Sequence, residues 1–185
     1  MSVQSKNLMW CLPRPKRNKY KGGMPLHAEE WLIKEACNIL DLRRAEILSV
    51  FCGMCEYGVR VDIKPEVNPH YIGDVHKLSE FLPEKLYDII LADPPYSTEE
   101  SKEIYGTGKL SYRTWTKECD KYLRPGGIFI VYHKLQMPNP DPKNYLVVRR
   151  ICIMGSPWHL PRLVIFYRKK GWGKDKSQQH ELKVL

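Results

Sequence analysis

The sequence predicts an α/β protein built on one open, mostly parallel β-sheet. Short apolar runs of strand length alternate along the chain with segments of helical periodicity. Several of these runs are continuously apolar, as expected for strands that helices cover on both faces. The last two strand-like runs have no helix between them, so a hairpin and one antiparallel strand are expected at the end of the domain.

The predicted elements follow one another from residue 27 to residue 169. Residues 27–42 carry a broad apolar stripe with the spacing of an amphipathic helix. A short helix is expected within 76–86, and a longer one at 112–123 that stops at the Arg124-Pro125-Gly126-Gly127 turn. Strands are predicted at 47–51, 59–63, 71–75, 87–92, 128–133, 145–154 and 163–169.

Length and composition favour a single domain. The chain has 185 residues, 43% of them hydrophobic, which is enough for one core of ordinary size. No apolar run approaches the roughly 18 residues of a membrane span, and the first residues lack a signal-peptide pattern. We therefore expect a cytoplasmic protein that does not contact membranes and whose cysteines are reduced.

Basic residues are concentrated near the two ends of the sequence. The formal net charge is +9. Residues 13–23 hold five basic residues and no acidic residue, and residues 168–176 hold five basic residues and one acidic residue. This distribution indicates arms that bind nucleic acid, and the alternative is solvated tails that aid solubility. We expect an irregular basic arm at 1–26, a single domain at 27–170 and a basic tail at 171–185.

A four-residue motif follows the strand predicted at 87–92. It consists of Asp93, Pro94, Pro95 and Tyr96. Ligands of open parallel sheets bind beyond the carboxyl ends of the strands, so the motif stands where a site is expected. Asp93 can accept a hydrogen bond from an aromatic amine, the prolines stiffen the loop, and Tyr96 offers a ring on which a base can stack. The alternative is an ordinary turn between a strand and a helix.

This motif resembles the (Asp/Asn/Ser)-Pro-Pro-aromatic signature of class I S-adenosylmethionine-dependent amino-methyltransferases. Its continuation into a Tyr-Gly-Thr segment and a helix that ends in Leu-Arg-Pro-Gly-Gly also resembles small, uncharacterised methyltransferases of phage and microbial genomes, and adenine N6 is the favoured target. The resemblance implies a Rossmann-like fold in which Asp93, Pro94, Pro95 and Tyr96 bind and orient the amino group that receives the methyl group. Adenine in DNA or RNA is the expected substrate.

Residues upstream of the motif match the same family in order. Phe51-Cys52-Gly53 resembles the turn after its first strand, Asp62 ends the second strand, and Asp74 follows the third. The resemblance implies that S-adenosylmethionine is the cofactor, with Asp62 at its ribose hydroxyls and Asp74 near its adenine. The implied cofactor-binding residues are Phe51, Cys52, Gly53, Asp62, Ile63, Asp74 and Val75.

The sequence departs from the family between the first two strands. Members usually have a full helix there, whereas only residues 52–58 separate Phe51 from Val59, and the usual second glycine is missing. We therefore expect the first crossover helix to be shortened or absent. Cys52 and Cys55 lack the second cysteine pair typical of a structural zinc site, so no metal is expected.

Substrate contacts are expected from two other segments. Tyr105, Lys109 and Arg113 occupy a polar stretch after the motif, and Trp158 lies between the last two strands. The alternatives are an ordinary loop for the first three residues and simple packing at the core edge for Trp158. The short sequence shows no separate target-recognition domain, which leaves room for a partner subunit.

Two other functions remain open at this point. A protein glutamine amide or a small-molecule amine could be the substrate of the same chemistry. The shortened first connection also suits a non-catalytic, methyltransferase-like subunit that binds nucleic acid.

Overall fold

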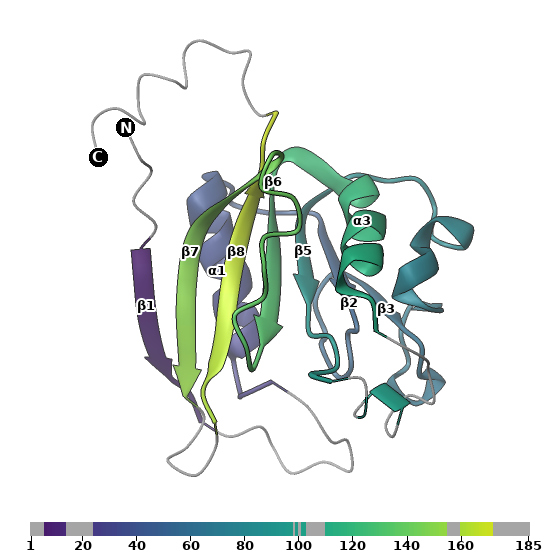
Figure 1. Ribbon diagram of the computed structural model, residues 1–185, viewed down its shortest axis with the longest axis horizontal. Coiled ribbons are helices and arrows are strands. Elements are labelled where there is room, and N and C mark those ends of the chain that lie inside the picture. Colours follow the sequence, from purple (N-terminus) through teal and green to yellow (C-terminus); the bar gives the residue numbers. More distant parts are fainter. Residues whose placement is uncertain are drawn as a thin grey trace.

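The protein is described by a computed structural model that covers residues 6–13, 24–97, 99, 101–102, 110–154 and 160–171. In this part of the chain, eight strands form one sheet (Figure 1). The strands are β1 (Lys6–Cys11), β2 (Ile47–Val50), β3 (Val59–Asp62), β4 (Tyr71–Ile72), β5 (Tyr87–Ala92), β6 (Leu123–His133), β7 (Tyr145–Met154) and β8 (Arg162–Lys169).

The strands lie in the order β1-β7-β8-β6-β5-β2-β3-β4. Strand β8 is antiparallel to both of its neighbours, and all other pairs are parallel. This confirms the mostly parallel sheet with one antiparallel strand. Because β2 lies between β3 and β5, the chain changes direction across the sheet at this strand, which is where open α/β sheets bind ligands.

Helices cover both faces of the sheet. Helix α1 (Ala28–Leu40) lies behind it in Figure 1, and α3 (Tyr112–Tyr122) lies in front. Alternating residues of each strand face the two sides: Ile89 and Leu91 pack in the core with α1, whereas Ile90 and Ala92 pack in the core with α3. Both helices start within one residue of the predicted position.

The connection between β2 and β3 contains no helix, as the sequence predicts. Its backbone turns sharply instead, with left-handed φ angles at Phe51 (51°), Gly53 (49°) and Gly58 (70°). The Cys55 amide donates to the Cys52 carbonyl at 2.8 Å, which closes a tight turn. Two adjacent parallel strands are thereby joined by residues 51–58 alone.

The expectation of an irregular segment at 1–26 is wrong for Lys6–Cys11. This segment forms β1, which pairs in parallel with β7, and the ring of Trp10 meets Trp31 of α1 edge-on at 5.7 Å. Pairing between strands that are far apart in the sequence leaves no pattern among neighbouring residues. The nearby prolines and glycines do leave such a pattern, and it is typical of irregular structure. Residues 14–23 and 172–185, which include most of the basic residues of the two ends, lie outside the described residues.

Three further boundaries differ from the prediction. Strand β6 starts at Leu123, so the Arg-Pro-Gly-Gly stretch belongs to the strand, and a register shift between Tyr87 and Ile89 of β5 accompanies it. Strand β4 has only two residues. The helix expected within 76–86 is a 3₁₀ helix, η2 (Val75–Glu80), and a single 3₁₀ turn, η1 (Pro65–Val67), precedes β4.

Replacing Gly58 by alanine is expected to destabilise the protein strongly. The added Cβ would lie 2.7 Å from the Cβ of Ile47, at a residue with φ of 70°. Left-handed backbone costs a non-glycine residue about 1–2 kcal/mol, and crowding of this kind adds about 1–3 kcal/mol. Urea denaturation should therefore show a loss of about 2–5 kcal/mol in the free energy of unfolding.

Gly171→Ala is the matched control for this prediction. Gly171 also has positive φ, at 94°, but within the described residues its added Cβ would meet only Pro125, at an ordinary 3.5 Å. We expect a loss of about 1–2 kcal/mol from the backbone alone. Equal losses in the two variants would contradict the close approach of Gly58 to β2.

Candidate active site

The strand register brings predicted site residues together at the carboxyl ends of the parallel strands. Val50 on β2 pairs with Val61 on β3 and with Ala92 on β5. One residue beyond this row, Asp62 ends β3 and Asp93 begins the loop after β5. The two carboxylates expected to serve cofactor and substrate therefore lie at the same end of the sheet, its lower end in Figure 1, on the two strands that flank β2.

A small cavity lies at this end of the strands. Its volume is about 20 Å³, enough for a single water molecule, so a nucleoside would have to move its walls to enter. Four predicted cofactor residues and one residue of the motif line it together. The lining residues are Phe51, Ile63, Gly73, Asp74, Val75, His76, Pro95, Ser101 and Leu110.

Asp62 is buried beside the turn after β2. One carboxylate oxygen accepts a hydrogen bond from the Gly53 amide at 2.8 Å, and the other accepts one from the Lys64 amide at 3.0 Å. These bonds fix the carboxylate and tie the glycine turn to the end of β3. A carboxylate oxygen has a second lone pair, so Asp62 can still accept hydrogen bonds from a diol.

The strained backbone of Phe51 is held by aromatic packing. Its ring meets the buried ring of Trp115 edge-on, with centroids 5.3 Å apart. Trp115 also meets Tyr112 and Phe129 edge-on, at 5.2 and 5.8 Å. Each such pair contributes about 0.5–1.5 kcal/mol, comparable with the roughly 1–3 kcal/mol that a left-handed residue costs. The packing therefore keeps the Phe51 ring in the cavity wall.

Asp74, His76 and Ser111 connect the cavity wall to α3. Asp74 caps η2 by accepting from the His76 amide at 3.0 Å, and it lies 2.7 Å from Nδ1 of the same imidazole. Nε2 of His76 accepts from the Ser111 amide at 3.0 Å. The ring thus carries its proton on Nδ1, and it links the segment after β4 to the start of α3.

The motif itself lies between the cavity and the strand β8. Pro94 and Pro95 are buried, whereas Asp93 and Tyr96 are half-buried. The neighbouring Tyr132 is buried, and this burial, followed by the charges of Tyr96 and Asp93, raises its pKa far above the usual range. Tyr132 is therefore a neutral hydroxyl next to the Asp93 carboxylate.

Two cations contact the ring of Tyr96, and sequence reasoning missed both. The guanidinium carbon of Arg162 lies 4.8 Å from the ring centroid, and the ammonium group of Lys134 lies 5.6 Å from it. Nε of Arg162 also donates to the Tyr96 hydroxyl at 3.1 Å. Arg162 starts β8 and Lys134 follows β6, so only the strand order could have identified them.

The thiols of Cys52 and Cys55 have low reactivity. Both are buried, and burial is the largest cause that raises the pKa of Cys52 to about 12 and that of Cys55 to about 11. Reactive or metal-bound thiols require the opposite shift. Among the described residues, no group of three or more His, Cys, Asp and Glu side chains is arranged to hold a metal ion.

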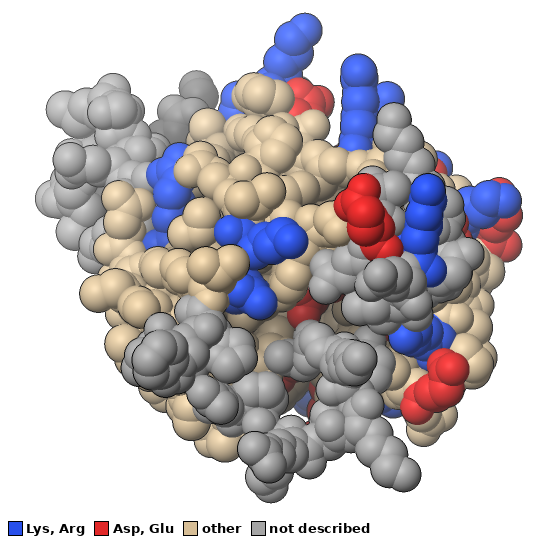
Figure 2. Space-filling view, turned by 60° about the horizontal axis from the view of Figure 1, so that its bottom comes forward, with Lys and Arg blue, Asp and Glu red and all other residues tan. Residues whose placement is uncertain are grey.

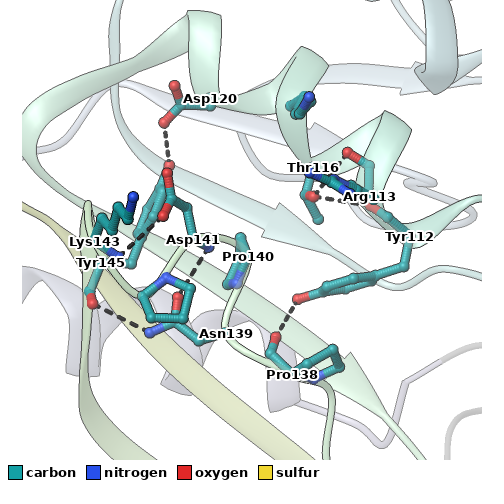
Figure 3. Close-up of a pocket in the computed structure, with 12 residues that line it drawn as sticks. Tyr112, Arg113, Thr116, Asp120, Pro138, Asn139, Pro140, Asp141, Lys143 and Tyr145 are labelled. Carbon is teal, nitrogen blue, oxygen red and sulfur yellow. Dashed lines mark hydrogen bonds between the residues drawn. The ribbon is translucent and has the colours of Figure 1, made fainter.

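A larger pocket of about 580 Å³ lies between α3 and the segment that joins β6 to β7 (Figure 3). The Tyr112 hydroxyl donates to the Pro138 carbonyl across it at 2.7 Å. Arg113 lines this pocket and not the cavity beside the motif, so the structure does not bring it to the other predicted site residues. Tyr105, Lys109 and Trp158 lie outside the described residues.

Two solved structures show the same arrangement of strands and helices. TrmN from Thermus thermophilus superposes with a TM-score of 0.52 at 16% identity, over 75% of this chain and 48% of that one. The N-methyltransferase NodS from Bradyrhizobium japonicum, in complex with S-adenosyl-L-homocysteine, superposes with a TM-score of 0.52 at 14% identity, over 76% and 84%. The chain has a Rossmann-like methyltransferase fold.

One curated protein shares sequence with this methyltransferase-fold chain. The type II methyltransferase M.BamHI from Bacillus amyloliquefaciens is 30% identical over 111 residues. The match covers 54% of this chain and 25% of M.BamHI, so the chain spans about a quarter of its relative. No family model matches the sequence. No helix in the described part of the chain has the length and apolar character needed to cross a membrane.

Alkylation should separate Cys11 from the two cysteines of the turn. Cys11 is exposed, whereas Cys52 and Cys55 are buried with pKa values of about 12 and 11. At pH 8 a thiol of pKa 11 is ionised in about one molecule in a thousand. Iodoacetamide followed by mass spectrometry should therefore modify Cys11 and spare the other two until urea unfolds the protein. Rapid labelling of the native turn would refute this account of the thiols.

Proposed function

We propose that the protein is an S-adenosylmethionine-dependent methyltransferase that acts on an exocyclic amino group, with adenine N6 in DNA or RNA as its substrate. The observation that carries this proposal is the shared cavity. It joins a residue of the Asp93-Pro94-Pro95-Tyr96 motif to the residues whose types suit a nucleoside. The match to a type II methyltransferase supports the same reading.

The residues around the cavity fit the adenosine part of the cofactor. Phe51, Ile63 and Val75 supply apolar contacts for a ring. Asp74 stands in the same wall with a carboxylate for an amino group. Asp62 is held beside the turn, where its carboxylate suits the two hydroxyls of a ribose. When bound, S-adenosylmethionine supplies a methyl group activated on a sulfonium sulfur.

Asp93 has the role of orienting the nucleophile in this proposal. Its carboxylate accepts a hydrogen bond from the amino group, which favours a nitrogen lone pair directed at the methyl carbon. A carbonyl of the proline pair would accept the second hydrogen. As the nitrogen bonded to the methyl carbon, the bond between that carbon and sulfur would break, and the nitrogen would then lose one proton to the solvent. Such positioning contributes about 7–11 kcal/mol of barrier lowering in favourable cases.

Nucleic acid is the proposed partner because of the surroundings of Tyr96 and the charge of the chain. The ring can stack on a base taken out of its helix, and the net charge of +9 attracts a polyanion.

Cofactor binding is the first test. S-Adenosyl-L-homocysteine should bind in calorimetric titration, and Asp62→Ala and Asp74→Ala should each weaken binding at least about tenfold, equal to about 1.4 kcal/mol. Glu84→Ala, which removes an exposed acid before β5, should bind normally. Urea denaturation of each variant separates a lost contact from a lost fold. Unchanged affinity in both aspartate variants would remove them from the cofactor site.

The second test concerns Asp93. Asp93→Ala should abolish transfer of labelled methyl groups to adenine-containing oligonucleotides, because the amino group loses its acceptor, and it should leave S-adenosyl-L-homocysteine binding within about twofold. Asp93→Asn is the matched control, since the amide keeps a carbonyl acceptor and should retain part of the activity. Near-normal transfer by Asp93→Ala would exclude this residue from catalysis.

A non-catalytic nucleic-acid-binding subunit is the second candidate. The short connection between β2 and β3 favours it, because it lacks the helix that usually follows the first strand in class I methyltransferases. Salt-sensitive binding of nucleic acid without any binding of S-adenosylmethionine or S-adenosyl-L-homocysteine would support this second function.

A further inference from the structure

We propose that Arg162 and Lys134 form a binding site for a backbone phosphate of the nucleic acid, next to the base that stacks on Tyr96. This inference rests on the proposed function and names the groups that would hold the strand during transfer. It is independent of the basic segments at the two ends of the chain.

Strand pairing places the two cations side by side. His133 at the end of β6 pairs with Leu163 on β8, and the next residue of each segment, Lys134 and Arg162, approaches the ring of Tyr96. Lys134 and Arg162 both lie at the end of the sheet where Asp93 follows β5. Figure 2 turns this end toward the reader and shows basic atoms near the middle of the face.

Two positive groups held close together repel each other unless a negative charge lies near them. Asp93 interacts electrostatically with Arg162 and Glu99 with Lys134, but in the described part of the chain neither cation forms an ion pair with a carboxylate. The ring of Tyr96, which both cations approach, offsets a further part of the repulsion. Both cations are therefore able to bind an external anion.

The geometry of Arg162 suits a phosphate. Its Nε donates to the Tyr96 hydroxyl and its Nη1 donates to the Leu160 carbonyl at 2.8 Å, which fixes the guanidinium plane. Nη2 makes no hydrogen bond within the described residues, and its two N–H groups are available to phosphate oxygens. Lys134 adds a second charge on a flexible chain. Because both cations approach the ring of Tyr96, the last residue of the motif, the phosphate they bind belongs to the nucleotide held at the motif or to its neighbour.

The salt dependence of DNA binding tests this site. A fluorescent single-stranded oligonucleotide that contains adenine is titrated with the full-length protein at increasing salt. Each lost phosphate contact reduces the slope of log K against log salt by about 0.7 for a single strand. Arg162→Gln and Lys134→Gln should each show such a loss, whereas Arg162→Lys should keep the slope because it keeps the charge.

Arg43→Gln is the matched control for charge. Arg43 is exposed between α1 and β2, at the opposite end of the strands, and its loss should leave the slope unchanged. The Arg162 and Lys134 variants should also raise KM for the oligonucleotide with a smaller effect on kcat, and their affinity for S-adenosyl-L-homocysteine should stay within about twofold.

The outcomes separate this site from the proposed function. Unchanged slopes in both glutamine variants would overturn the phosphate site while methyl transfer by the wild-type protein still stood. A fall in kcat with an unchanged slope would also overturn it, since Arg162 would then act only through Tyr96. Reduced slopes without any methyl transfer would support the site in a nucleic-acid-binding protein that is not an enzyme. Equal competition by polyglutamate of the same charge would overturn its preference for phosphate.

Discussion

The hydrogen bond from the Gly53 amide to the buried Asp62 carboxylate closes the connection on which the rest of the site depends. Because residues 51–58 must join two adjacent parallel strands without a helix, the backbone takes left-handed angles at three positions. A fixed carboxylate at the end of β3 provides an acceptor for the amide that this turn directs inward. In the proposed function, the same carboxylate accepts hydrogen bonds from the hydroxyls of a ribose.

Local strain and packing compensate one another around this turn. Phe51 holds an unfavourable φ angle, and the buried aromatic cluster centred on Trp115 holds its ring. Trp115 belongs to α3, whose first turn is joined through Ser111 and His76 to Asp74. The turn, the start of α3 and Asp74 are therefore joined by one continuous set of contacts around the cavity.

Two kinds of chemistry meet at the carboxyl ends of the parallel strands. On one side of the motif, the carboxylate of Asp74 and the apolar side chains of Phe51, Ile63 and Val75 line the small cavity. On the other side, β8 brings Arg162 and Lys134 to the ring of Tyr96. The antiparallel placement of β8 is the cause, since it returns the start of the strand to the edge where the parallel strands end.

The sequence by itself determined the alternation of strands and helices, the missing first helix and the placement of Asp62, Asp74 and Asp93 after successive strands. These features depend on local periodicity and on residues at strand ends, both of which can be read from neighbouring positions. Only the tertiary structure decided the pairing of Lys6–Cys11 with β7, the contact of Arg162 and Lys134 with Tyr96, and the displacement of Arg113 to another pocket. Those features depend on strand order, because residues distant in sequence become neighbours only when the sheet is assembled.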